Sequence, residues 1–173
     1  MFERLTDRAR GVFATAKREA ENVRYDDITV EQLMIALLDE DRGQASRLLT
    51  SAGVDVHSLR QYLVSCTPPA PNPSARTILE RAAQEAREFG HNYIGTGHLL
   101  LAVTRAPGSA AQRVLSEHAF DHSKAVAMLA AAIEESRSRP EWRSFKARRS
   151  AALFLCFAAF VAWIAYQLWS AFG

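Results

Sequence analysis

The sequence contains an internal repeat. Shifting the chain by 66 residues aligns its first part with its second without gaps. About a fifth of the aligned positions are identical, spread over the whole unit, as expected for two copies of one structural unit. The identical pairs include Ala9/Ala75, Arg10/Arg76, Ala16/Ala82, Glu19/Glu85, Ala20/Ala86, Ile28/Ile94, Leu33/Leu99, Ala36/Ala102, Ala45/Ala111, Arg47/Arg113, Leu49/Leu115, Asp55/Asp121 and Leu63/Leu129. We therefore expect two halves with the same fold.

Each unit is predicted to form four helices. In the first unit, Thr6 is a suitable N-cap for a helix with an apolar stripe. Thr29 and Gln32 form a capping-box pattern at the start of a second helix. A short third helix is expected around residues 45–49, and Asp55 is placed to cap a fourth. No sustained alternation of β-branched residues indicates a strand, so the fold class is all-α.

The two units are expected to pack together as a pseudo-symmetric pair. The repeats cover residues 1–65 and 75–135, and the segment between them, 66–74, is rich in proline. Proline interrupts helices, so this segment is predicted to be an extended connector. One unit of about 60 residues can build only a small core alone, which favours a core shared by both repeats.

Charge is distributed unevenly along the chain. Residues 136–150 form a basic neck with a net charge of +5, whereas the residues before Arg137 carry −3, from 15 basic and 18 acidic side chains. An acidic body argues against nucleic-acid binding, because neutralising phosphates requires clustered Lys and Arg.

An uncharged segment without proline follows the neck, at residues 151–172. At about 1.5 Å per residue, a helix of this length would span roughly 33 Å, enough for a bilayer core. Trp163, Tyr166 and Trp169 lie in its second half, as in an aromatic belt at a membrane interface. A buried core helix is the alternative, but such helices rarely run so long without a charge. The prediction is one transmembrane helix.

The basic flank predicts the orientation of this helix. Lys146, Arg148 and Arg149 precede the apolar segment, and only Gly173 follows it. Positively charged flanks stay in the cytoplasm, so the N-terminal body is expected on the cytoplasmic side. The same side chains can contact anionic headgroups. Residues 1–10 are charged throughout and do not resemble a signal peptide, so the chain is predicted to be tail-anchored.

Two motifs indicate a family. The opening MFERLTDRAR and the second-unit GHNYIGTGHLLLAV resemble the N-terminal domain of the Clp unfoldases of the ClpA and ClpC type, also called the Clp repeat domain. The resemblance covers about residues 1–135 and implies binding of substrates and adaptors. Unfoldases of this family continue into ATPase modules, but no G-x-x-x-x-G-K-[ST] phosphate-binding loop occurs here. We therefore expect no ATP-driven unfolding by this chain alone.

The resemblance to ClpC-type domains also implies a site for phosphorylated arginine. The positions carried over are Thr6, whose helix N-terminus offers donors to phosphate, and Glu31, whose carboxylate would pair with the guanidinium. The alternative is that Thr6 only caps the first helix and Glu31 only complements the dipole of the second. In the second unit the corresponding positions hold Asn72 or Ser74 and Gly97, so a second site there lacks its carboxylate.

A third candidate position is Phe2. In the family an exposed aromatic residue near the start contributes to an apolar surface that docks adaptors or peptides. Phe2 matches that residue by position, with Leu5 beside it. The competing interpretation is simple packing onto the first helix.

The remaining reactive residues indicate no enzyme. His118 and His122 are four residues apart, but Asp121 is placed to cap a helix between them, so no metal site is expected. Cys66 has no basic neighbour that would activate a thiol. The sequence therefore predicts no catalytic residue, no metal and no cofactor.

These features together predict a membrane-tethered recognition module in a bacterial inner membrane. It would bind peptides, Clp clients, adaptors or the Clp machinery itself, either to recruit them or, as a decoy, to compete for them. The alternative is a structural scaffold or oligomerisation module of a membrane complex, in which the ligand-binding groove of the family is unused.

Overall fold

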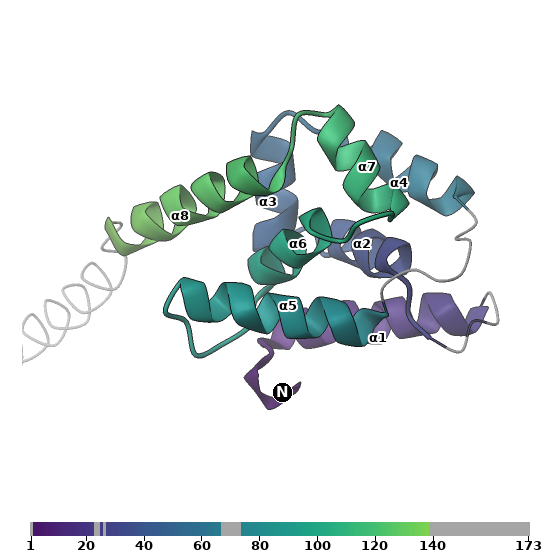
Figure 1. Cartoon of the computed structure of the whole chain (residues 1–173), viewed down its shortest axis with the longest axis horizontal. Helices are drawn as coiled ribbons and strands as arrows, with labels where there is room; N and C mark the ends of the chain where they lie inside the picture. Colours follow the sequence, from purple (N-terminus) through teal and green to yellow (C-terminus); the bar gives the residue numbers. More distant parts are fainter. Residues whose placement is uncertain (1, 23–24, 26, 67–73, 139–173) are drawn as a thin grey trace, which may run out of the picture. The chain divides into compact units, whose positions relative to one another are not determined.

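The described part of the chain is entirely helical in its regular elements. A computed structural model describes residues 2–22, 25, 27–66 and 74–138. Within these ranges the helices are η1 (Phe2–Arg4), α1 (Asp7–Asn22), α2 (Val30–Asp39), α3 (Gln44–Ser51), α4 (Val56–Ser65), α5 (Ala75–Glu88), α6 (Thr96–Thr104), α7 (Ala110–Glu117) and α8 (His122–Ser138) (Figure 1). The all-α prediction is confirmed, since each half of the described chain supplies four α-helices in the expected order.

Local capping explains where several helices begin. At α2, Gln32 N–H donates to the Thr29 hydroxyl and Thr29 N–H donates to the Gln32 side chain, which completes the predicted capping box. Asp55 accepts from two backbone N–H groups at the start of α4. Asp121 accepts from Lys124 N–H at 2.8 Å at the start of α8. These bonds satisfy N–H groups that have no partner within their own helix.

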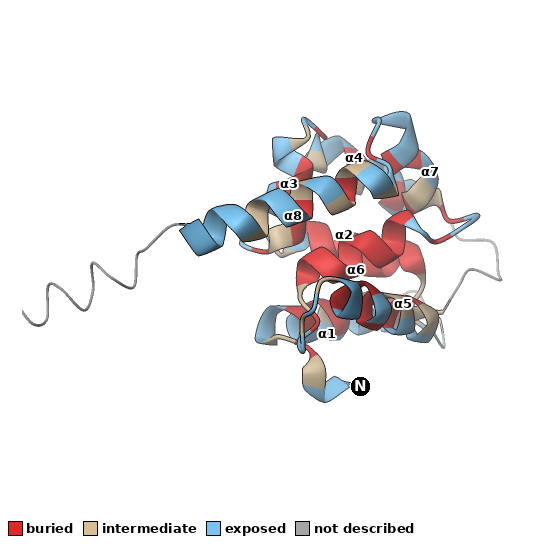
Figure 2. Ribbon diagram, turned by 60° about the vertical axis from the view of Figure 1, so that its left-hand side comes forward, coloured by how far each residue is buried: buried red, intermediate tan, exposed pale blue. Residues whose placement is uncertain are grey.

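Two helices, one from each repeat, form the centre of the core. All residues of α2 from Val30 to Leu38 are buried, and so is every residue of α6 (Figure 2). Helices buried on all sides are surrounded by other elements. Here α1 packs on α2 and α5 on α6, while α3 contacts α6 and α7 contacts α2, so the outer helices cross from one repeat to the other.

Backbone hydrogen bonds also connect the two repeats reciprocally. Thr6 N–H donates to the Ile94 carbonyl at 3.0 Å, and Ile94 N–H donates to the Arg4 carbonyl at 2.7 Å, which forms an isolated parallel bridge. In the other direction, Ala75 N–H at the start of α5 donates to the Ile28 carbonyl at 3.1 Å. Ile28 and Ile94 occupy the same position in the two repeats. The start of each repeat is therefore fixed by the other repeat.

Residues 1–131 form one compact unit, and the described residues 132–138 lie outside it. In the described ranges, no helix has the length and apolar character needed to cross a bilayer. Residues 67–73 of the predicted connector, most of the basic neck and the predicted span 151–172 lie outside the described residues. Lys146, Arg148, Arg149, Trp163, Tyr166 and Trp169 therefore stay sequence predictions, as do the proposed boundaries of these segments.

Candidate functional site

The side chain of Thr6 caps α1. Its hydroxyl accepts a hydrogen bond from Ala9 N–H at 3.3 Å, the geometry of an N-cap residue bonding the third residue of its helix. Its backbone N–H is bonded to Ile94 in the opposite repeat. Thr6 therefore caps the first helix, which is the structural role given above as the alternative to ligand binding.

Glu31 caps a helix of the other repeat. Although it lies in the first turn of α2, its side chain is buried, with 2% exposure, and its Oε1 accepts from Ala110 N–H at 2.8 Å. Ala110 is the first residue of α7, whose remaining first-turn groups include Gln112 N–H, bonded to the Ser109 hydroxyl at 3.1 Å. A carboxylate at this end of a helix satisfies an N–H group and complements the helix dipole. The sequence offered a ligand role or the dipole of its own helix for Glu31, and the structure adds a contact with a residue 79 positions away.

The second repeat makes the equivalent contact with a different residue. Thr96 Oγ1 accepts from Gln44 N–H at 2.9 Å and Ala45 N–H at 3.4 Å, at the start of α3. Next to it is Gly97, the position at which the family pattern has glutamate. A Cβ atom on Gly97 would lie 2.9 Å from Leu129 Cδ1 and 3.3 Å from Gln44 Oε1. Thr96 therefore does for α3 what Glu31 does for α7, and the space beside Gly97 is already occupied.

The contacts of the two carried-over residues lead to different parts of the second repeat. Thr6 bonds to Ile94, and Glu31 bonds to the first residue of α7. Asp27, which precedes α2, is exposed. The side chains of Thr6 and Glu31 already act as hydrogen-bond acceptors. The exposed carboxylate of Asp27 adds negative charge near the start of α2.

Phe2 is the most exposed large apolar side chain in the described ranges. It is 61% exposed, yet its ring meets the ring of Phe13 edge to face, with centroids 5.7 Å apart. Phe13 lies on the buried face of α1. Phe2 is thus packed on the first helix and also exposed on the surface. Its position is therefore compatible with both sequence interpretations, packing and docking.

Two histidines, His91 in the loop after α5 and His98 in the first turn of α6, lie next to each other. Gly95 N–H donates to His98 Nδ1 at 3.0 Å, so neutral His98 carries its proton on Nε2 and donates it to His91 Nδ1, 3.0 Å away. Burial, and secondarily the charge of His91, lowers the pKa of His98 from 6.5 to about 4. His98 is therefore neutral at physiological pH. Tyr93 stacks on His91 with ring centroids 4.8 Å apart, which covers the pair.

Among the described residues, no group of three or more His, Cys, Asp or Glu side chains is arranged to bind a metal ion. His118 and His122 are separated by the end of α7 and the start of α8, as the Asp121 cap predicted. His122 Nδ1 instead lies 3.1 Å from the Thr104 hydroxyl.

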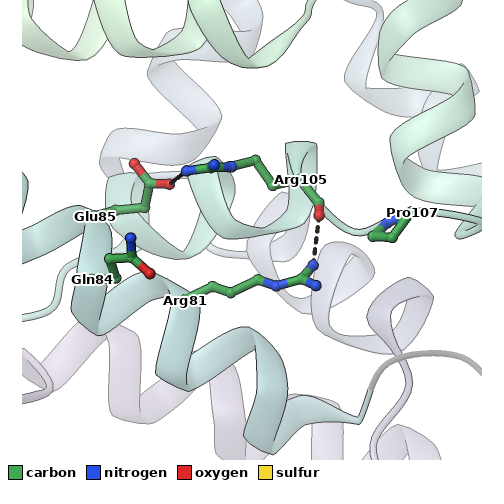
Figure 3. A pocket seen from close by; sticks show the side chains of 5 residues that line it. All are labelled: Arg81, Gln84, Glu85, Arg105 and Pro107. Carbon is green, nitrogen blue, oxygen red and sulfur yellow. Dashed lines mark hydrogen bonds and ion pairs between the residues drawn. The ribbon is translucent and has the colours of Figure 1, made fainter.

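An ion pair between buried Glu85 on α5 and half-exposed Arg105 after α6 was not expected from the sequence. Glu85 is 2% exposed and its Oε1 accepts from Arg105 Nη1 at 3.1 Å (Figure 3). The signal was present in the sequence, because Glu85 follows Ile78 and Ala82 at helical spacing on the apolar face of α5. A carboxylate on a buried face requires a partner, and Arg105 supplies it.

Comparison with characterised sequences places this fold in a family. The sequence profile of the Clp repeat (R) N-terminal domain matches residues 4–118 and 70–141. A ClpA homologue described as an ATP-dependent Clp protease ATP-binding subunit, from Guillardia theta, is 37% identical over 134 residues, which is 72% of this chain and 16% of that protein. The chaperone protein ClpC1 of Arabidopsis thaliana is 35% identical over 133 residues, covering 71% of this chain and 14% of ClpC1. The chain thus spans about one sixth of the length of these relatives.

Solved structures agree with this assignment at the level of the fold. The N-terminal domain of ClpD from Arabidopsis thaliana has a TM-score of 0.58 and 20% identity, covering 78% of this chain and 97% of that one. The N-domain of ClpV from Vibrio cholerae has a TM-score of 0.62 and 18% identity, covering 75% and 84% of the two chains. With the profile match over both repeats and relatives above one third identity, the chain belongs to the Clp repeat N-terminal domain family.

Proposed function

We propose that this chain is a non-enzymatic, membrane-tethered Clp-type N domain. It binds peptides, client proteins or adaptors, and so recruits them to Clp proteolysis or regulates that process. The observation that supports the proposal is the match to the Clp repeat domain across both repeats, together with the closed two-repeat core. Arginine-phosphorylated proteins are among the ligands that the family resemblance implies.

The membrane part of the proposal rests on the sequence. The uncharged segment 151–172, the preceding Lys146, Arg148 and Arg149, and the aromatic residues of its second half favour a single span, with the helical body on the cytoplasmic side of a bacterial inner membrane. Tethering would keep the binding domain near the bilayer and raise its effective concentration for partners located there.

Alkaline carbonate extraction of membranes tests the tether. The full chain is expected to stay in the membrane pellet. The double variant Ala159→Arg with Ala162→Arg is expected to move to the supernatant, because each central Arg costs roughly 2.5–3.5 kcal/mol on insertion. The matched control Ala171→Arg places its charge at the end of the segment and should stay in the pellet. Extraction of the unmodified chain by carbonate would disprove the tether.

Binding is tested on the full chain in detergent. Titration calorimetry with phosphoarginine measures the ligand that the family resemblance implies, and anisotropy of dye-labelled, reduced and alkylated α-lactalbumin measures binding of an unfolded client. Co-purification from cells then separates the two modes of action. Clients recovered without the Clp motor favour a decoy, and clients recovered together with the motor favour a recruiter. Absence of binding to both probes would contradict the proposal.

A second function, that of a structural scaffold, is favoured by the contacts of Glu31 and Gly97. Glu31 is buried against the start of α7, and Gly97 lies against Leu129 and Gln44. The glutamate position of the family's ligand motif is therefore used in packing in both repeats. A scaffold would bind neither phosphoarginine nor the unfolded client, and crosslinking would instead recover a constant set of membrane partners.

A further inference from the structure

A polar pocket lies at the second repeat, on the side of α5 that faces the loop after α6. It has a volume of about 430 Å³. Figure 3 shows the side chains that line it. Its lining consists of Arg81, Gln84, Glu85, Arg105 and Pro107. None of these residues belongs to the Thr6 and Glu31 positions carried over from the family, so the pocket is a separate feature of the surface.

The charged side chains of the pocket are held in place by hydrogen bonds. Arg105 Nη1 donates to Glu85 Oε1, and Arg81 Nη1 donates to the Arg105 carbonyl oxygen. Glu85 is buried, and His122 Nε2 lies 3.7 Å from the same Oε1. Its second oxygen, Oε2, is buried with no hydrogen-bond partner in the described part of the chain. Glu85 therefore fixes the position of the Arg105 side chain.

The pocket carries a net positive charge. The lining contains two guanidinium groups and one carboxylate, and Gln84 and Pro107 are neutral. Each guanidinium has five N–H donors, of which the bonds described above use one, so donors remain for a ligand. The Arg105 side chain is 49% exposed, which leaves it accessible to solvent. A planar, bidentate donor in this setting matches a carboxylate.

The first repeat has no equivalent of this pair of arginines. The shift of 66 residues places Thr15 and Asp39 at the positions of Arg81 and Arg105. Asp39 instead accepts from Arg60 Nε at 2.7 Å. At the same place in the fold, one repeat thus offers two guanidinium groups and the other a paired carboxylate, so any ligand selected by this charge would bind to the second repeat alone.

We propose that this pocket binds a carboxylate of a peptide, either an acidic side chain or the C-terminal carboxylate. Arg81 and Arg105 are the residues that contact the carboxylate, and Glu85 positions Arg105. This inference rests on the proposed peptide-binding function and names one chemical class of its ligands. An acidic partner would then be selected by the second repeat, independently of any use of Glu31.

Fluorescence anisotropy of the full chain in detergent, with short dye-labelled peptides, tests the assignment. The first peptide ends in two aspartates with a free C-terminus, the second has the same sequence with a C-terminal amide, and the third has two asparagines and an amide. The first should bind at least fivefold more tightly than the third. The second peptide shows whether side-chain or terminal carboxylates contribute most.

Arg81→Gln is the informative variant, since Arg105→Gln would leave Glu85 buried without its main partner. Arg81→Gln should weaken binding of the acidic peptide about fivefold or more, as expected for loss of a charge-assisted contact. Arg87→Gln, a change of an exposed arginine on the same helix, should alter binding less than about twofold, as expected for a charge outside the pocket. Equal binding of the acidic and neutral peptides, or no effect of Arg81→Gln in a variant that melts like the unmodified chain, would overturn the assignment. If unfolded α-lactalbumin still binds in that case, only the pocket assignment fails; if acidic peptides bind through Arg81 but the unfolded client does not, client capture fails instead.

Discussion

Replacing Glu31 tests whether this residue serves the fold or a ligand. Its buried carboxylate accepts a hydrogen bond from Ala110 N–H at the first residue of α7. Glu31→Ala removes this acceptor from a partly buried N–H group at the start of α7. A hydrogen bond to a charged group contributes about 1.5–3 kcal/mol, and a favourable charge at a helix N-terminus about 0.3–1 kcal/mol. Because burying the carboxylate itself has a cost, we expect a net loss of about 2 kcal/mol.

This loss converts into a measurable shift in melting temperature. The compact unit comprises residues 1–131. With an unfolding entropy of about 2.1 cal/mol/K per residue, such a unit loses roughly 7 °C for 2 kcal/mol, provided that it unfolds in two states. Thermal denaturation followed by circular dichroism at 222 nm measures the shift, and urea denaturation gives the free energy of unfolding independently.

Two variants serve as controls for Glu31→Ala. Glu31→Gln keeps a side-chain oxygen acceptor and loses only the charge, so it should destabilise by about 1 kcal/mol or less. Glu21→Ala removes an exposed carboxylate whose partner, Lys17, is 3.8 Å away, and its effect should stay below about 0.5 kcal/mol. A melting temperature for Glu31→Ala within about 1 °C of the unmodified chain would refute the capping role. If that variant also lost phosphoarginine binding, Glu31 would be a ligand-binding residue instead.

Two further predictions concern charge. The pKa of His98 is lowered to about 4 in the folded state, so the unfolded state takes up a proton first as the pH falls. The contribution of His98 to stability is therefore complete above about pH 6.5 and declines between about pH 6.5 and 4. His98→Gln, which keeps an acceptor at this cap, should make the free energy of unfolding less dependent on pH in that window, and an unchanged slope in urea titrations would contradict this. Arg105→Ala should destabilise by about 2 kcal/mol, because it leaves Glu85 buried without its ion-pair partner. Arg60→Ala, which breaks the more exposed pair with Asp39, should cost less than about 1 kcal/mol; equal losses in the two variants would show that burial of the carboxylate does not decide the effect.

The helices and their starts could be predicted because their causes are local. A capping box needs residues three positions apart, and Thr29 with Gln32 satisfies it within one turn. Asp55 and Asp121 cap their helices by accepting from N–H groups two or three residues further along the chain. The repeat itself was visible because it preserves the apolar positions that both halves bury. For these features the sequence contains the physical cause within a short window.

The contacts that join the repeats could not be predicted in this way. Glu31 reaches Ala110, and Thr96 reaches Gln44, over separations of 79 and 52 residues. Each bond requires α7 to pack on α2 and α3 to pack on α6, and this crossing follows from the packing of the whole core. A glutamate in the first turn of a helix has a complete local explanation in the helix dipole, and so its distant partner leaves no separate mark in the sequence.

The reciprocal contacts also explain how the two halves can differ at equivalent positions. Each repeat must supply an acceptor for the first N–H groups of a helix in the other, because those groups are partly or wholly buried. The first repeat supplies Glu31, while the second supplies Thr96, next to Gly97. Once a threonine hydroxyl satisfies the start of α3, a glutamate at Gly97 is not needed there, and the space it would enter is filled by Leu129 and Gln44. Loss of the family's carboxylate in the second repeat is therefore compatible with an intact core, so the fold alone does not require both copies of the ligand motif.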